Sequence, residues 1–169
     1  MYIRPDDARK FPDLAIIIQR MFFTVASRPK LKDALERYAG DPYALAVLYP
    51  QGPTVRIDPD FFRCEEDGAP EKQPDGSYVQ KFRMKAGFTP PSAAANEIYI
   101  ALDIAQNAGT ADGRVMAEAT LLHECVHWSR LIDDRDVWSE KEPYAFETAA
   151  YGKVMSRSYD ICPARKVVK

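Results

Sequence analysis

The stretch TLLHECVHWSR, residues 120–130, constrains this chain more than any other part of the sequence. It holds both histidines of the 169 residues, His123 and His127, four positions apart, and Glu124 directly follows the first. Residues at this spacing lie on one face of an α-helix, about one turn apart. The sequence therefore predicts a helix near residues 113–132 that presents two imidazoles to a single ion.

This HExxH arrangement is typical of catalytic zinc sites. Zinc binds the two imidazoles as neutral ligands, and Glu124 is left uncoordinated, where it can take a proton from the attacking water and later protonate the leaving amine. Leu121, Leu122, Cys125 and Val126 supply the apolar opposite face that such a helix requires. We predict Zn²⁺ as the cofactor, although the same ligand types would also hold iron(II), manganese or nickel.

The third metal ligand must be a carboxylate, because no histidine remains. Asp133 has the spacing of the metzincin pattern, but Arg130 stands where that pattern needs a glycine to end the helix. Glu142 lies at the start of the last predicted helix, where an acidic residue also suits the helix dipole. Glu147 lies inside that helix, in an apolar segment, and is the favoured third ligand.

Composition bounds the class of protein. The 23 Lys and Arg residues are balanced by 25 Asp and Glu residues, so no nucleic-acid partner is expected. The longest apolar run is interrupted by Gln19 and Arg20, so no membrane span is expected either. Residues 1–10 lack the apolar core of a signal peptide. With 46% hydrophobic residues, the chain can form one packed core, and we expect a single domain over residues 1–169.

Proline, glycine and periodicity predict the remaining elements. Residues 12–28 and 29–40 each begin at a proline and predict two packed helices. Residues 41–91 are rich in proline and glycine, with short alternating segments, TVRI and SYVQKFRM, that predict strands in long loops. The fold class is therefore α+β.

The clearest strand is NEIYIALDI, residues 96–104, which alternates apolar and polar positions and ends at a polar loop. We expect it to form an edge strand near 97–103 in a small irregular sheet. Asp112 is the predicted N-cap of the HExxH helix. A C-terminal helix is expected near residues 143–158, with proline in its first turn.

The three cysteines, Cys64, Cys125 and Cys162, form no CxxC pair and indicate neither a disulfide framework nor a cysteine zinc site. Buried apolar positions are the simplest interpretation. A bridge between Cys64 and Cys162 stays open for an oxidising compartment, because both lie in turn-rich or terminal segments.

HECVHW, followed after a charged loop by EPYAFETAAYG, resembles the metallopeptidase toxin type 3 family, a group of HExxH domains among bacterial polymorphic toxins and secretion effectors. The matching stretch runs from NEIYIAL to Gly152, about a third of the chain. The resemblance implies a zincin-like fold of the gluzincin type, with His123 and His127 as metal ligands, Glu124 as catalytic base and Glu147 as third ligand.

Further residues could complete such a site. Peptide hydrolysis builds an oxyanion that needs a second donor beside the metal, and Tyr151 is the first candidate, with Tyr144 the alternative. Zincins place an edge strand before the active helix to pair with an extended substrate, a role expected for NEIYIAL. Trp128 is expected in the core, and Trp138 at the rim of a cleft.

The sequence thus predicts a zinc-dependent metallopeptidase, a bacterial toxin or secreted effector that is made in the cytoplasm and delivered by a specialised secretion system. A protein or peptide substrate and a cognate immunity protein are the expected partners. Two alternatives remain: a hydrolase of peptidoglycan stem peptides, and a non-catalytic zinc-containing binding module. Glu124 disfavours the second alternative, because a structural zinc site has no use for a base.

Overall fold

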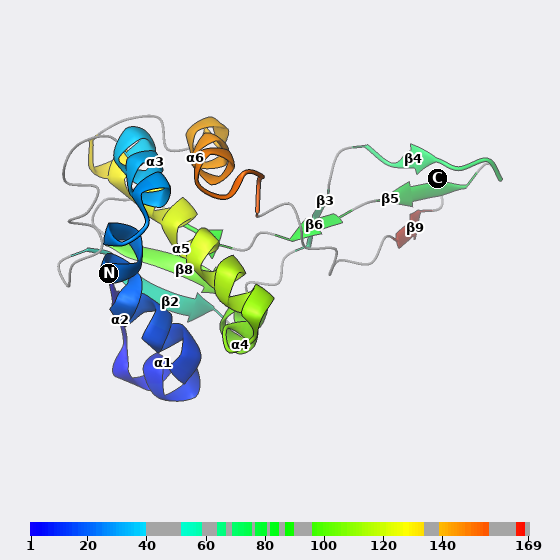
Figure 1. Cartoon of the computed structure of the whole chain (residues 1–169). Coiled ribbons are helices and arrows are strands. Elements are labelled where there is room, and N and C mark those ends of the chain that lie inside the picture. Colours follow the sequence, from blue (N-terminus) through cyan, green and yellow to red (C-terminus); the bar gives the residue numbers. More distant parts are fainter. Residues whose placement is uncertain are drawn as a thin grey trace.

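The computed structural model describes residues 1–39, 52–58, 64–66, 69–75, 77–80, 82–84, 87–89, 96–133, 139–155 and 165–167. Trp138 and Cys162 lie outside these residues, as does the side chain of Cys64, so the expected cleft rim and the Cys64–Cys162 bridge stay predictions. A mixed architecture of helices and a small, mainly parallel sheet is compatible with the predicted α+β class (Figure 1).

The main part of the molecule, which we call the body, is built on a four-stranded sheet with the strand order β1-β2-β8-β7. Its strands are β1 (Tyr2–Ile3), β2 (Thr54–Asp58), β7 (Gly87–Phe88) and β8 (Glu97–Ala101). The first three in spatial order run parallel, with Val55 opposite Ile98, and β7 is antiparallel to β8. Since β8 pairs with β2 on one side and β7 on the other, the expectation that residues 97–103 form an edge strand is wrong: within the described sheet, the edge strands are β1 and β7.

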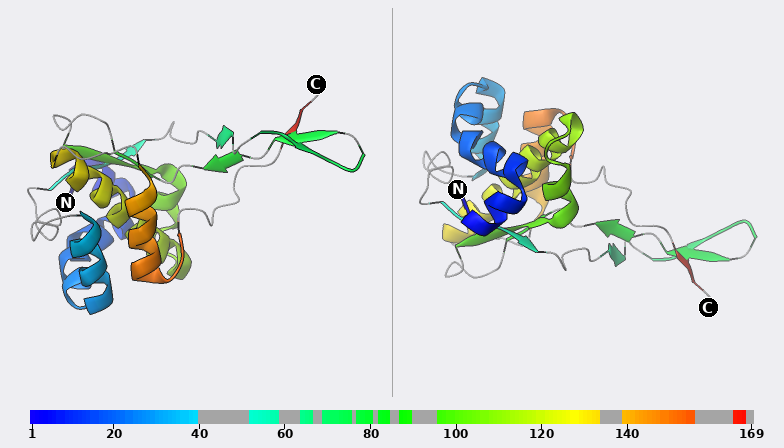
Figure 2. Two further views of the ribbon diagram at one scale, coloured as in Figure 1. Left: turned by 90° about the horizontal axis from the view of Figure 1, so that it is seen from above. Right: turned by 90° about the horizontal axis from the view of Figure 1, so that it is seen from below.

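Helices cover the sheet along one side of the body, as both views of Figure 2 show. They are α1 (Pro5–Lys10), α2 (Pro12–Ala26), α3 (Pro29–Ala39), α4 (Leu102–Asn107), α5 (Ala111–Ile132) and α6 (Lys141–Tyr151). The core forms where α2, α3 and α6 pack around α5 and where α5 packs on β8. Leu14, Leu35, Ile98, Leu122 and Phe146 are fully buried there. Helix α5 is thus the central element, enclosed by helices and sheet.

The remaining strands form an extension that projects from the body (Figures 1 and 2). It contains β3 (Cys64–Glu66) paired with β6 (Phe82–Met84), and the three-stranded set of β4 (Glu71–Lys72), β5 (Tyr78–Gln80) and β9 (Arg165–Val167). All three pairings are antiparallel. The predicted strands within TVRI and SYVQKFRM are therefore confirmed as β2, β5 and β6.

Several element boundaries differ from those expected. The strand predicted over residues 96–104 ends at Ala101, because Leu102 and Asp103 open α4, which was not predicted. Helix α6 ends at Tyr151, well before residue 158, because Gly152 adopts a left-handed φ of 81° and stops the helix. Helices α2 and α3 match the ranges expected for them, residues 12–28 and 29–40, closely.

No helix in the described part of the chain is long and apolar enough to cross a membrane.

Candidate metal centre

Helix α5 is fixed at its start by a side-chain cap. Thr110, rather than the expected Asp112, is the N-cap, and its Oγ1 accepts a hydrogen bond of 3.0 Å from the Gly113 N–H. Gly113 approaches the backbone of Asn107 so closely that a Cβ would lie 1.9 Å from its carbonyl oxygen. The cap and this close approach fix where α5 begins.

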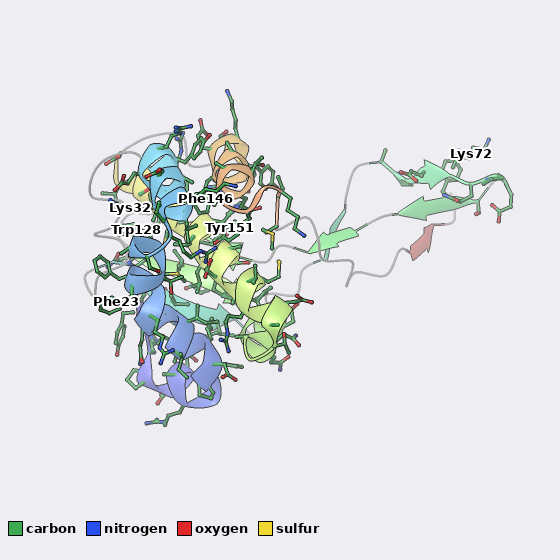
Figure 3. All side chains as sticks on the ribbon, viewed as in Figure 1. Phe23, Lys32, Lys72, Trp128, Phe146 and Tyr151 are labelled. Atoms are coloured by element: carbon green, nitrogen blue, oxygen red, sulfur yellow. The ribbon has the colours of Figure 1, made fainter. Side chains whose placement is uncertain are left out.

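Residues 119–127 of α5 are all buried. Leu121, Leu122, Cys125 and Val126 are fully buried, as the HExxH interpretation requires, and burial raises the pKa of the Cys125 thiol to about 12. Trp128 packs against the same core, as expected (Figure 3). The helix thereby holds its polar residues within an apolar shell.

His123 and His127 lie side by side, with ring centroids 5.0 Å apart, and are 5% and 7% exposed. Glu140, directly before α6, faces both rings. Its Oε2 lies 3.2 Å from Nε2 of His123 and 3.5 Å from Nε2 of His127. This oxygen is buried, yet it has no well-directed hydrogen-bond partner in the part of the chain that the structure describes. Two imidazole nitrogens and a carboxylate oxygen therefore converge on one point.

The electrostatics of this group favour a cation. Burial alone would lower the pKa of His123, but the carboxylates of Glu140 and Glu147 outweigh burial and raise the pKa of His123 to about 10. Burial likewise opposes ionisation of Glu140, but the two facing imidazoles hold the pKa of its carboxyl well below the ordinary value. The site stabilises positive charge between the rings and the carboxylate.

Glu147 lies on the other side of His123. It is fully buried, and its Oε1 is 2.7 Å from Nδ1 of His123. Its Oε2 accepts a hydrogen bond from the backbone N–H of Met155, beyond the end of α6. When Nδ1 donates its proton to Glu147, the lone pair of the neutral imidazole is on Nε2, the nitrogen that faces Glu140. Glu147 therefore fixes both the tautomer and the orientation of His123.

The other candidate ligands lie elsewhere. Glu142 Oε2 is 3.6 Å from Nη2 of Arg130, and Asp133 is an exposed residue at the C-terminal end of α5. Among the described residues, the only group of three side chains whose ligand atoms lie within 4.8 Å of one another is His123, His127 and Glu140.

The two tyrosines expected near the site differ in position. The hydroxyl of Tyr151 donates to Oε1 of Glu118, 2.9 Å away, and Arg28 pairs with the same oxygen at 2.6 Å. Burial and the Glu118 carboxylate raise the pKa of Tyr151 above its ordinary value. Tyr144, by contrast, lies beside His123, with ring centroids 5.8 Å apart. Figure 3 shows Tyr151 where α6 meets α5.

Glu124 is buried beside the group of His123, His127 and Glu140, and it contacts the residue that follows β7. Oγ1 of Thr89, directly after β7, donates to Oε2 of Glu124 at 2.8 Å and lies 3.1 Å from the Glu124 carbonyl oxygen. No other hydrogen-bond partner of the Glu124 side chain occurs among the described residues. One carboxylate oxygen is thus held by Thr89, and the other remains available.

Sequence reasoning missed both Glu140 and Thr89. Glu140 lies in the charged segment SEKEP, where Glu142 drew attention because it directly precedes a proline. Thr89 lies in a region rich in glycine and proline and carries no local signal. An antiparallel strand placed beside the HExxH helix would have identified Thr89, but periodicity alone does not reveal which strands are neighbours.

The spacing of Glu140 Oε2 from the two imidazoles is compatible with tetrahedral coordination of a metal ion. Ligand atoms about 2.05 Å from zinc are about 3.3 Å apart in a tetrahedron. The observed separations of 3.2 and 3.5 Å between Glu140 Oε2 and the two Nε2 atoms are close to this value. A buried carboxylate oxygen without a well-directed hydrogen bond has a lone pair that a cation can use.

Comparison with known proteins identifies a family to which the chain is similar. The model of a family described as metallopeptidase toxin 3 matches residues 7–152. No curated protein and no solved structure matches the chain. The family match extends far beyond the third of the chain in which the motifs lie, and includes β7, Thr89 and most of the described helices.

Proposed function

Because the chain belongs to the metallopeptidase toxin 3 family, we propose that it is a zinc-dependent peptidase of toxin or effector type. The observation that carries the proposal is the buried Oε2 of Glu140, which faces two Nε2 atoms without a hydrogen-bond donor. His123, His127 and Glu140 would hold the zinc ion. Glu140 takes the place of Glu147 as third ligand, because both oxygens of Glu147 are already bonded to His123 and Met155.

A bound zinc ion would supply Lewis acidity, which lowers the pKa of water and polarises the scissile carbonyl. The protein's own residues do the remaining work. Glu124 accepts a proton from the attacking water through its available carboxylate oxygen and passes it to the leaving amine. Glu147 keeps His123 in the required tautomer through Nδ1. Tyr144, beside His123, is the nearer of the two tyrosines as a donor to the oxyanion.

The substrate we propose is an extended peptide segment. β1 and β7 are the two edge strands of the described sheet, and β7 is the one followed directly by Thr89, which contacts Glu124. A peptide that paired with β7 would run past the base, so its backbone would be recognised through main-chain hydrogen bonds. The family match supports, as parts of the same proposal, a zincin-like fold, delivery into a target cell and inhibition by a cognate immunity protein.

The test measures zinc content by elemental analysis and proteolysis of casein on the same samples. Wild type should hold one zinc ion per chain, and Glu124→Gln should keep it while kcat/KM falls by about 10²–10⁴-fold, the usual contribution of a general base. Glu36→Gln, a half-buried glutamate paired with Lys32 on α3, is the matched control and should behave as wild type. A wild-type protein that binds no metal would refute the proposal.

Purified sacculi offered beside casein distinguish the two substrate classes. Release of stem peptides without cleavage of casein would move the proposal to peptidoglycan, with the same residues in the same roles. Zinc binding without hydrolysis of either substrate would favour the non-catalytic module.

A further inference from the structure

We propose that Thr89 is a positioning residue that holds the general base Glu124 in its reactive orientation from an edge strand of the sheet. This inference rests on the proposed peptidase function. It goes beyond that function because it assigns a role to a residue outside both the HExxH helix and the ligand set.

The Thr89 hydroxyl has one proton to donate, and two acceptor oxygens lie within hydrogen-bond distance of it. The carboxylate oxygen Oε2 of Glu124 is the nearer, at 2.8 Å, and the Glu124 carbonyl oxygen is at 3.1 Å. A hydrogen bond to an ionised carboxylate is stronger than one to a neutral carbonyl. Thr89 therefore donates mainly to Oε2, and the carbonyl oxygen is a weaker second acceptor of the same proton.

This contact restricts the rotation of the Glu124 side chain. An unrestrained glutamate side chain loses rotamer entropy when it must present one oxygen in one direction during the reaction. A hydrogen bond that already holds Oε2 before the substrate binds lowers this entropic cost in the reaction. Glu124 is 4% exposed, so water competes little for the same oxygen. Oε2 is thereby committed to Thr89, and Oε1 is the oxygen that receives the proton.

The position of Thr89 links substrate binding to the base. It directly follows β7, whose residues Gly87 and Phe88 pair with Ile100 and Tyr99 of β8. A change in the position of β7 would move the hydroxyl relative to α5. Ordering of β7 by a paired substrate would therefore favour the reactive orientation of Glu124, an effect on kcat rather than on KM.

The experiment compares Thr89→Val, which keeps the shape and loses the hydroxyl, with Thr89→Ser, which keeps the hydroxyl. Thr89→Val should lower kcat by about tenfold with KM and zinc content unchanged, and Thr89→Ser should restore most of kcat. Thr148→Val is the matched control, because the Thr148 hydroxyl bonds a helix carbonyl, that of Tyr144, and lies on the exposed side of α6. Unchanged kcat in Thr89→Val would overturn the inference.

A second readout needs no catalysis. In the metal-free protein, Thr89→Val should lower Tm by about 2–4 °C in the wild-type background and by less than half as much in a Glu124→Ala background, because the contact is then already lost. Equal shifts in both backgrounds would overturn the contact itself. If the coupling is present and no substrate is cleaved, the proposed function fails while the link between Thr89 and Glu124 stands, so the two failures are distinguishable.

Discussion

The body and the extension differ in what stabilises each of them internally. In the body, the core residues come from α2, α3, α5, α6 and the sheet, and many are fully buried. In the extension, Glu71, Lys72, Pro74 and Asp75 are exposed, and none of its described side chains belongs to the core. Figure 3 shows Lys72 far from the packed side chains of the body. Strand pairs of two or three residues contribute little stability by themselves.

A site of this kind depends on the burial that the body provides. Burial in the body lets carboxylates orient imidazoles with little competition from water, because charge-assisted hydrogen bonds strengthen as the local dielectric falls. The same side chains on the extension would be solvated. We therefore expect substitutions of the buried polar residues around His123 to have large effects, and comparable substitutions in the extension to have almost none.

Glu140→Gln should have the largest effect. It removes a charged ligand, so the Kd for zinc should rise by more than about 100-fold, beyond the range expected for an outer partner. The measurement is a zinc titration against a competing chelator. Glu142→Gln, in the same segment but paired with Arg130, is the control and should leave the Kd unchanged. A larger loss in Glu147→Gln than in Glu140→Gln would return the ligand role to Glu147.

Glu147→Gln should raise the Kd for zinc by about 10–100-fold, since the amide can still bond His123 but no longer polarises it. Met155 would also lose a charged acceptor, so Tm should fall in the metal-free protein as well. The same titration and a thermal melt measure both effects. An unchanged Kd would show that the orientation of His123 does not depend on this carboxylate.

Tyr151→Phe should affect stability alone. The substitution removes the hydrogen bond to Glu118, worth about 1 kcal/mol, which corresponds to a fall in Tm of about 2–4 °C for a chain of this size. Thermal melting and peptidase assays on the same sample decide the point. A fall in kcat of more than about tenfold with Tm unchanged would support the oxyanion role that the sequence suggested for Tyr151.

Asp103→Asn should stabilise the body slightly at neutral pH. Both carboxylate oxygens of Asp103 are buried and lack a hydrogen-bond partner in the described chain, and burial raises the pKa of this carboxyl. A raised folded-state pKa means that the folded protein prefers the protonated acid, so ionisation costs stability above that pKa and nothing below the unfolded value of about 3.9. The gain in Tm over wild type should therefore be present at pH 7 and vanish near pH 3.

Asp75→Ala, in the extension, should have the smallest effect. Asp75 Oδ1 accepts hydrogen bonds from the backbone N–H and the hydroxyl of Ser77, which lowers the pKa of Asp75, but the carboxylate is solvent-exposed. We expect a change in Tm of less than about 2 °C and full peptidase activity. A large loss of either would show that the extension is coupled to the body, contrary to the comparison.

The sequence predicted best those features that one helix determines by itself. The spacing of His123 and His127 fixed their common face, and the apolar residues around them predicted the burial of α5. The family assignment, made from two short motifs, is confirmed over residues 7–152. Helices α2 and α3 begin at Pro12 and Pro29, as a first-turn proline predicts.

Features that depend on contacts between distant segments were not predictable. The place of β8 inside the sheet depends on β7, and the position of Glu140 depends on how the chain enters α6. The alternation in NEIYIALDI is equally compatible with an edge strand and an interior strand, because one half-buried face occurs in both. The expected role of Tyr151 rested on its distance of one helical turn from Glu147, and spacing does not give the direction in which a phenol points.

The bond between Glu147 and the backbone of Met155 has a consequence for tolerance to insertions. Together with the left-handed turn at Gly152, it closes a short ring of chain that begins and ends at the carboxylate behind His123. A residue added or deleted between these two points would shift the N–H away from Glu147 and release one of its oxygens. Length variation among related chains should therefore avoid this ring, whereas the extension could grow or shrink without disturbing the proposed metal ligands.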